Sequence, residues 1–210
     1  MKFRYVLVLA AILLATQSML AQGPSQVIKP EADPVAWLAD FETRLTGTTE
    51  SSQRMFLLRN MAPAALAAKD EQRAAKFSKE LADLGLELRS VPGFGPGLYS
   101  DATFISNTVL GHIALKNGQL ETAKEHLLNA GDVTGSSVLN SFGPGMSLAK
   151  ELLDRGERET VIKYLDQCSK FWRMDRGSLA KWKTAIENGN TPNFGLGDLR
   201  RTLDTWKFTQ

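Results

Sequence analysis

The sequence predicts an all-α fold made of helical hairpins, and three observations support this. First, small and apolar residues recur at helical spacing on both sides of Gly118, namely at Leu110, Ala114, Ala123 and Leu127. This spacing is typical of two amphipathic helices folded back on each other, with glycine at the turn. Second, the pattern returns 38 residues later, at Gly156 and Val161. Third, apolar residues also recur at helical spacing in residues 34–45. The content of 43% hydrophobic and 23% charged residues is ordinary for a soluble domain.

The chain begins with the features of a secretory signal peptide. A basic start at residues 1–4 precedes an apolar run at residues 5–15 and a short exit to Ala21, after which we expect cleavage. The alternative is an uncleaved membrane anchor, but the apolar run is shorter than the ~20 residues that a spanning helix needs. Residues 22–33 are polar and lack periodicity, which predicts a flexible linker. We therefore expect a periplasmic or secreted protein.

The charge balance gives no reason to expect a nucleic-acid or lipid partner. Cleavage would remove Lys2 and Arg4 from the 25 basic residues and none of the 23 acidic ones, so the mature chain would be nearly neutral. Such a chain lacks the electrostatic attraction that polyanions require, and we expect no membrane insertion after cleavage. Cys168 is the single cysteine, so no internal disulfide can form, and its place on an apolar helix face predicts a buried thiol.

The N-terminal half predicts one capping helix and one degenerate hairpin. Residues 34–45 place apolar side chains at helical spacing. Residues 53–69 and 71–84 form the following pair of helices, with Lys69 where a glycine would be usual. This hairpin therefore repeats the central one imperfectly.

Two loops rich in glycine and proline are expected on either side of the central hairpin. Residues 87–100 form the first loop, and Asp101 is then placed to cap the next helix. Residues 131–145 form the second loop. Loops of this length are often functional or mobile.

The C-terminal part predicts a further hairpin followed by two short helices. Residues 142–172 repeat the pattern of the central hairpin. Ser178 can cap a helix over residues 179–187. A last helix is expected at residues 197–207, where one face carries Leu199, Leu203 and Trp206.

The central hairpin resembles a tetratricopeptide repeat (TPR), a unit of about 34 residues with Leu-Gly, Gly and Ala at fixed places. The matching residues are Leu110, Gly111, Gly118, Ala123, Leu127 and Ala130. Asn107 and Ala114 stand where the family usually has Trp and Tyr. The second copy matches at Leu148, Ala149, Leu152, Gly156, Val161, Leu165 and Cys168.

The resemblance implies a TPR-like α-solenoid of about three hairpins over residues 34–210, with an extra helix at each end. The implied repeats lie near residues 53–84, 104–131 and 142–172. Residues 135–153 also resemble a run in exported bacterial repeat proteins of unassigned function. The narrower resemblance implies a bacterial origin and no particular activity.

No residue pattern selects a catalytic, metal or cofactor site. His112 and His126 are the only histidines, and a zinc site would need further ligands and shows no HExxH spacing. The Gly-Pro stretches lack the Gly-Lys-Ser/Thr of a phosphate-binding loop, and no Gly-x-Ser-x-Gly elbow is present. We therefore expect no catalytic residue, no bound metal and no cofactor.

The remaining function is non-catalytic protein–protein interaction, as a scaffold or assembly factor in the bacterial cell envelope. In TPR-like repeats the first helices of the hairpins line a concave groove that holds a partner segment. By the family register the groove residues would be Phe56, Arg59, Ile105, Thr108, His112, Lys116, Met146, Lys150 and Asp154. The expected partner is a protein or peptide.

Two alternatives remain open. The first is a small-ligand or envelope-enzyme role for loops 87–100 and 131–145, which a deep pocket that includes His112 would favour. The second is homo-oligomerisation through the aromatic residues Trp172, Trp182 and Trp206.

Overall fold

The computed structural model describes residues 34–92 and 95–194, and every regular element in these ranges is an α-helix. The helices are α2 (Pro34–Thr46), α3 (Ser51–Ala67), α4 (Glu71–Leu88), α5 (Gly95–Lys116), α6 (Leu120–Gly131), α7 (Ser137–Phe142), α8 (Ser147–Leu153), α9 (Arg158–Cys168) and α10 (Ser178–Glu187). The predicted all-α class is therefore confirmed for this part of the chain. The predicted signal peptide, linker and helix at residues 197–207 lie outside the described residues.

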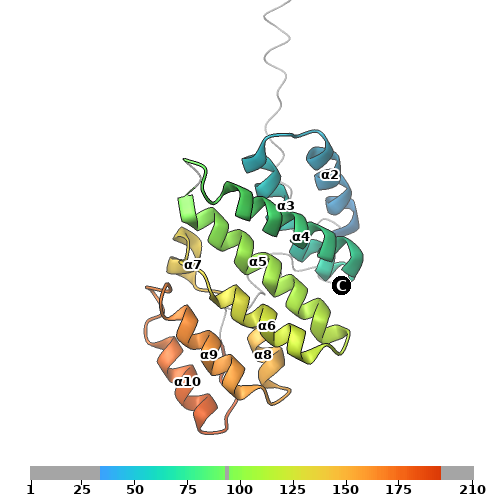
Figure 1. The fold of residues 1–210 in the computed structure, drawn as a ribbon. Helices are drawn as coiled ribbons and strands as arrows, with labels where there is room; N and C mark the ends of the chain where they lie inside the picture. Colours follow the sequence, from blue (N-terminus) through green and yellow to red (C-terminus); the bar gives the residue numbers. More distant parts are fainter. Residues whose placement is uncertain (1–33, 93–94, 195–210) are drawn as a thin grey trace, which may run out of the picture.

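Three pairs of consecutive helices pack as hairpins: α3 with α4, α5 with α6, and α8 with α9. Neighbouring hairpins are in contact through α4 and α5 and through α6 and α9, while α2 packs on α3 and α10 packs on α9. Figure 1 shows the three hairpins in their chain order, with α2 at one end of the molecule and α10 at the other.

The turns within the three hairpins share one backbone conformation. Lys69, Gly118 and Gly156 have positive φ angles of 61°, 73° and 91°. At the central turn, the Gly118 amide donates to Leu115 O at 3.1 Å and the next amide donates to Ala114 O at 2.9 Å, and the other two turns repeat these bonds. This is the Schellman motif, which satisfies the last carbonyls of a helix. Glycine is thus present at two of the bends, and a lysine adopts the same conformation at the third.

The interior consists of two hydrophobic clusters that meet at α5. The N-terminal core combines residues of α2 to α5, among them Leu38, Leu58, Met61, Phe77, Leu81 and Val109. The C-terminal core combines residues of α5 to α10 and the segment after α10, among them Phe104, Leu127, Leu148, Leu165, Cys168 and Phe194. Cys168 is fully buried, as predicted, and burial raises the pKa of its thiol.

The first glycine- and proline-rich loop is shorter than predicted. Helix α4 continues to Leu88 and α5 already begins at Gly95. Asp101 consequently lies inside α5, so the prediction that it caps this helix is wrong. The helix extends because Ser100, Ala102 and Phe104 are buried against neighbouring helices, and this packing outweighs the local preference of glycine and proline for loops.

Two further expectations are corrected. The stretch 131–145 is not wholly a loop, because it contains α7, whose N-cap Ser136 accepts a hydrogen bond from the Leu139 amide at 3.1 Å. Leu110 is half-buried and outside both cores, whereas the other three residues of its predicted face lie in the C-terminal core: Ala114, Ala123 and Leu127.

Within the described residues, none of the helices is long and apolar enough to cross a bilayer.

Candidate binding face

Seven of the nine predicted groove residues lie in the first helices of the three hairpins, α3, α5 and α8, and the other two, Met146 and Asp154, cap the ends of α8. Three of these residues serve the interior. Thr108 is 3% exposed and donates its hydroxyl to Phe104 O at 2.8 Å, while Met146 is fully buried. Ile105 is half-buried and packs against both cores. Thr108 and Met146 are therefore not exposed to a partner, whereas Ile105 keeps part of its surface exposed.

The other six predicted residues reach the surface to different degrees. Phe56, Lys116, Lys150 and Asp154 are exposed, and Arg59 and His112 are half-buried. Lys116 forms an ion pair with Glu71 at the start of α4. Lys150 and Asp154 lie one helical turn apart and pair at 2.7 Å. Exposed pairs of this kind contribute little to stability, so a partner can replace them.

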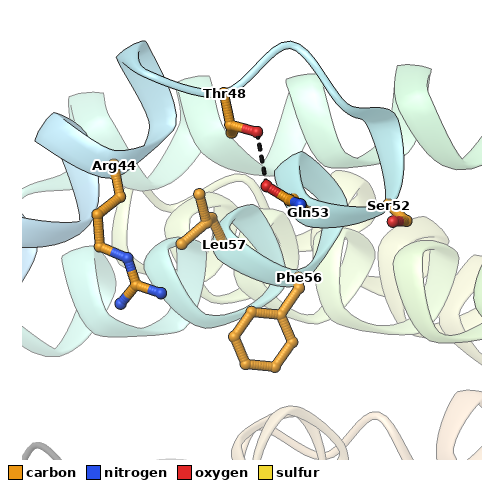
Figure 2. Close-up of a pocket in the computed structure, with 6 residues that line it drawn as sticks. All are labelled: Arg44, Thr48, Ser52, Gln53, Phe56 and Leu57. Carbon is orange, nitrogen blue, oxygen red and sulfur yellow. Dashed lines mark hydrogen bonds between the residues drawn. The ribbon is translucent and has the colours of Figure 1, made fainter. Parts of the chain in front are cut away.

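Phe56 borders an open depression between α2 and α3, which we call the α2–α3 depression (Figure 2). Its volume is about 310 Å³, and its walls are formed by Arg44, Thr48, Ser52, Gln53, Phe56 and Leu57. Leu57 is only 4% exposed, whereas Phe56 is 56% exposed. The depression therefore has a buried leucine in its wall and an exposed phenylalanine at its edge.

Glu50 orders the chain between α2 and α3. Its carboxylate accepts hydrogen bonds from the backbone amides of Ser52 at 3.0 Å and Gln53 at 2.7 Å, which caps α3. Hydrogen bonds from the Ser52 side chain and from these two amides lower the pKa of Glu50. Thr48 Oγ1 in turn donates to Gln53 Oε1 at 2.9 Å. The polar rim of the depression is thereby held in place by the start of α3.

Arg59 belongs to a second arrangement, a polar network between α3 and α5. Its Nη1 lies 3.4 Å from Asp101 Oδ2, and Ser136 Oγ donates to Asp101 Oδ1 at 2.6 Å. Asp101 is 8% exposed, so it is a buried carboxylate with two partners. The network connects α3, α5 and the start of α7. Removing one partner would leave a buried charge poorly compensated, which is costly.

His112 connects α5 to α8. Its Nε2 lies 2.8 Å from Ser147 Oγ and its Nδ1 lies 3.2 Å from Glu151 Oε1. The hydrogen bond from His112 lowers the pKa of Glu151. The order hydroxyl, imidazole, carboxylate is the one found in serine hydrolases. Here the carboxylate is 46% exposed and comes from the same helix as the hydroxyl, so the arrangement also serves as a bridge between two helices.

His126 takes no part in that arrangement. Its Nδ1 lies 2.9 Å from Asn107 Oδ1 on α5, and burial lowers the pKa of His126. The histidines therefore bond to different partners. Among residues 34–92 and 95–194, no three His, Cys, Asp or Glu side chains come together as metal ligands could.

Two of the three aromatic residues considered for oligomerisation pack against the rest of the molecule. Trp172 and Trp182 are half-buried against the C-terminal core, with ring centroids 5.8 Å apart. Trp182 Nε1 donates to Asn193 O at 3.1 Å, and its ring meets Phe194 edge-on at 5.2 Å. Trp206 lies outside the described residues.

Sequence reasoning found Phe56 and missed the rest of the depression. The acidic Glu50 just before an apolar run is a signal that could have indicated the start of α3, because a carboxylate there can accept from the free amides of the first turn. Arg44 gives no such signal, because only the packing of α2 on α3 brings it beside Leu57.

Comparison of the chain with protein-family models, with curated proteins and with solved structures finds no match.

Proposed function

We propose that the chain is a TPR-like α-solenoid that acts, after export, as a non-catalytic protein–protein interaction module of the bacterial cell envelope. The face of α3, α5 and α8 holds a segment of the partner, as the first helices of such repeats do. Helical hairpins with the same turn conformation, packed in chain order, are consistent with this architecture.

The observation that carries the proposal is the exposure of Phe56. An aromatic side chain that is 56% exposed beside an open depression is the kind of residue that anchors protein interfaces. Arg59 follows three residues later on the same helix and is half-buried beside α5, so the predicted surface continues from α3 towards α5. Lys116 and Lys150 extend the surface as exposed cations with local partners.

Site-specific photocrosslinking in cells tests this function. A benzophenone amino acid replaces Phe56, Lys116 or Lys150, and a matched control replaces Leu86 of α4, which is 61% exposed. We expect discrete adducts with one protein from the three face positions and none from Leu86. The identified protein is then purified, and its binding to the chain should weaken about tenfold with Phe56→Ser. Equal adducts from Leu86, or unchanged binding by the Phe56 variant, would refute the proposal.

One observation favours a second candidate, an enzymatic role beside loop 131–145. Ser147 Oγ and Glu151 Oε1 lie within hydrogen-bonding distance of the two nitrogens of His112, as a base-activated serine requires. A fluorophosphonate probe would then label Ser147 in the wild type and not in His112→Gln. Ser169 is exposed, donates its hydroxyl to a backbone carbonyl, and provides the control serine. Labelling of Ser147 no faster than that of Ser169 would remove this candidate.

A further inference from the structure

The walls of the α2–α3 depression offer two nitrogen donors, the side-chain amide of Gln53 and the guanidinium of Arg44, while the hydroxyls of Thr48 and Ser52 donate to Gln53 and Glu50. Thr48 donates its hydroxyl proton to Gln53 Oε1, which uses the acceptor of that amide. The Gln53 amide nitrogen has no hydrogen-bond partner within the part of the chain that the structure describes. The nearby Glu50 carboxylate is engaged by amides of α3. A ligand that supplies an acceptor can therefore bond to the nitrogens of Gln53 and Arg44.

Arg44 is the one charged residue among the six described residues that line the depression. Its guanidinium lies 4.9 Å from the centre of the Phe41 ring, which orients it by a cation–π contact. Its acidic neighbour Asp40 is 3.9 Å away, and both side chains are more than half exposed. Such a distant, solvated pair is weak, so the fork of the guanidinium can bind a carboxylate.

Phe56 and Leu57 make the apolar part of the depression, and Figure 2 shows their side chains close to that of Arg44. A volume of about 310 Å³ lies at the lower end of the range of small-molecule sites. It admits one or two side chains of a peptide. The surface thus combines an apolar contact with an adjacent cation.

We propose that the α2–α3 depression binds a partner segment in which an apolar side chain is followed closely by Asp or Glu. The apolar side chain packs between Phe56 and Leu57, and the carboxylate accepts hydrogen bonds from Arg44 and Gln53. The inference rests on the proposed interaction function and names the chemistry of the partner. Charge complementarity to Arg44 argues for this occupant, because Arg44 is the one charged residue among the described walls, while the neighbouring carboxylates of Asp40 and Glu50 are paired with Arg44 and bonded to the start of α3, respectively.

Selection from a phage-displayed library of random peptides on the purified full chain tests the proposal. We expect enriched peptides with Leu, Ile, Met or Phe within two positions of Asp or Glu. The best peptide should bind about tenfold more weakly to Phe56→Ser and to Arg44→Gln. Selection on Arg44→Glu should enrich Lys or Arg in place of the acid. The matched controls are Leu86→Ser and Arg89→Glu, an exposed leucine and an exposed arginine of the α4 region, and both should leave the selected motif unchanged.

Three results would overturn the proposal. The first is the absence of an enriched motif, and the second is the same acidic motif after selection on Arg44→Glu. The third is tighter peptide binding by the double variant Val27→Ser plus Ile28→Ser. Residues 22–33 of the chain carry Val27, Ile28 and Glu31, which match the proposed motif. Tighter binding by this variant would mean that the chain's own segment, and not a partner, occupies the depression. Crosslinking from Lys116 and Lys150 is a separate readout, so the interaction function can stand while the depression is excluded.

Discussion

The residues at the hairpin turns adopt one backbone conformation whether or not they are glycines. Lys69, Gly118 and Gly156 occupy the same position of the same Schellman motif, although only two of them are glycines. A side chain with a Cβ in the left-handed region costs about 1–2 kcal/mol, whereas glycine adopts this region freely. Lys69 therefore carries local strain that the neighbouring helices impose.

Replacing Lys69 by glycine should stabilise the protein. The side chain is exposed, so little contact is lost. We expect a gain of roughly 0.5–1 kcal/mol in the free energy of unfolding, since relief of strain exceeds the added entropy of the unfolded chain. Urea denaturation measures this value. Gly156→Ala, at the equivalent turn, should lose about 1 kcal/mol. A loss of stability in Lys69→Gly would contradict the account of the turn.

His126 predicts a pH dependence of stability. Burial lowers its pKa below the ordinary value of 6.5, so the unfolded chain binds a proton more readily than the folded one. Its contribution to stability is therefore present above that value and is lost as the pH falls towards the pKa of the folded state.

Denaturation of the wild type and of His126→Gln from about pH 7.5 to about pH 5.5 measures this contribution. The wild type should lose more stability over the interval than the variant does. The lowered pKa of Glu151 acts in a more acidic window, below the ordinary carboxylate value of 4.5, and leaves this comparison undisturbed. Parallel pH curves for the two proteins would show that His126 is not responsible.

At the scale of helices, glycine sets how closely two hairpins approach. A Cβ added to Gly85 of α4 would lie 2.6 Å from the Cβ of Ala102 on α5. Real side chains do not approach so closely, and neither atom can rotate away because both are attached directly to the backbone. The contact between the first two hairpins therefore depends on the pair formed by Gly85 and Ala102.

We expect Gly85→Ala to destabilise the protein by roughly 1–3 kcal/mol, through displacement of α4 from α5. Ala102→Gly should recover part of this loss in the double variant, because it removes the clashing methyl group. A thermal or urea double-mutant cycle gives the coupling between the two sites. Gly47→Ala is the control for added volume, since its Cβ would meet only ordinary contacts at 3.6 and 3.7 Å. Strictly additive effects at Gly85 and Ala102 would rule out direct contact.

At the scale of the whole molecule, α5 unites two cores into one stack. It supplies Val109 to the N-terminal core and Phe104 to the C-terminal core, while Ile105 packs against both. When two cores share one helix, cooperative unfolding depends on the residues that join them. Ile105 therefore contributes to the cohesion of the two cores, and its place in the predicted groove stays a prediction.

Ile105→Ala should reduce cooperativity more than it reduces overall stability. We expect a smaller dependence of the unfolding free energy on urea, or two separate transitions, because the N-terminal and C-terminal cores become less coupled. Leu128→Ala is the matched control, since Leu128 is also half-buried but packs only against the C-terminal core. Leu128→Ala should lower the urea concentration at the unfolding midpoint and leave the dependence of the unfolding free energy on urea unchanged. Equal slopes for both variants would show that Ile105 does not couple the cores.

The sequence by itself determined the helical class, the central hairpin with its glycine turn, and the burial of Cys168. These features depend on helical periodicity and on the conformational freedom of glycine, which act within a few residues and so can be read locally. The tertiary structure alone decided which distant side chains meet: Arg59 with Asp101, His112 with Ser147, and Arg44 with Leu57. His112 and Ser147 are 35 residues apart in the chain. Their contact depends on how separate hairpins cross and on their register. Close contacts between helices, such as that of Gly85 with Ala102, set the crossing and the register. No local sequence pattern encodes such contacts.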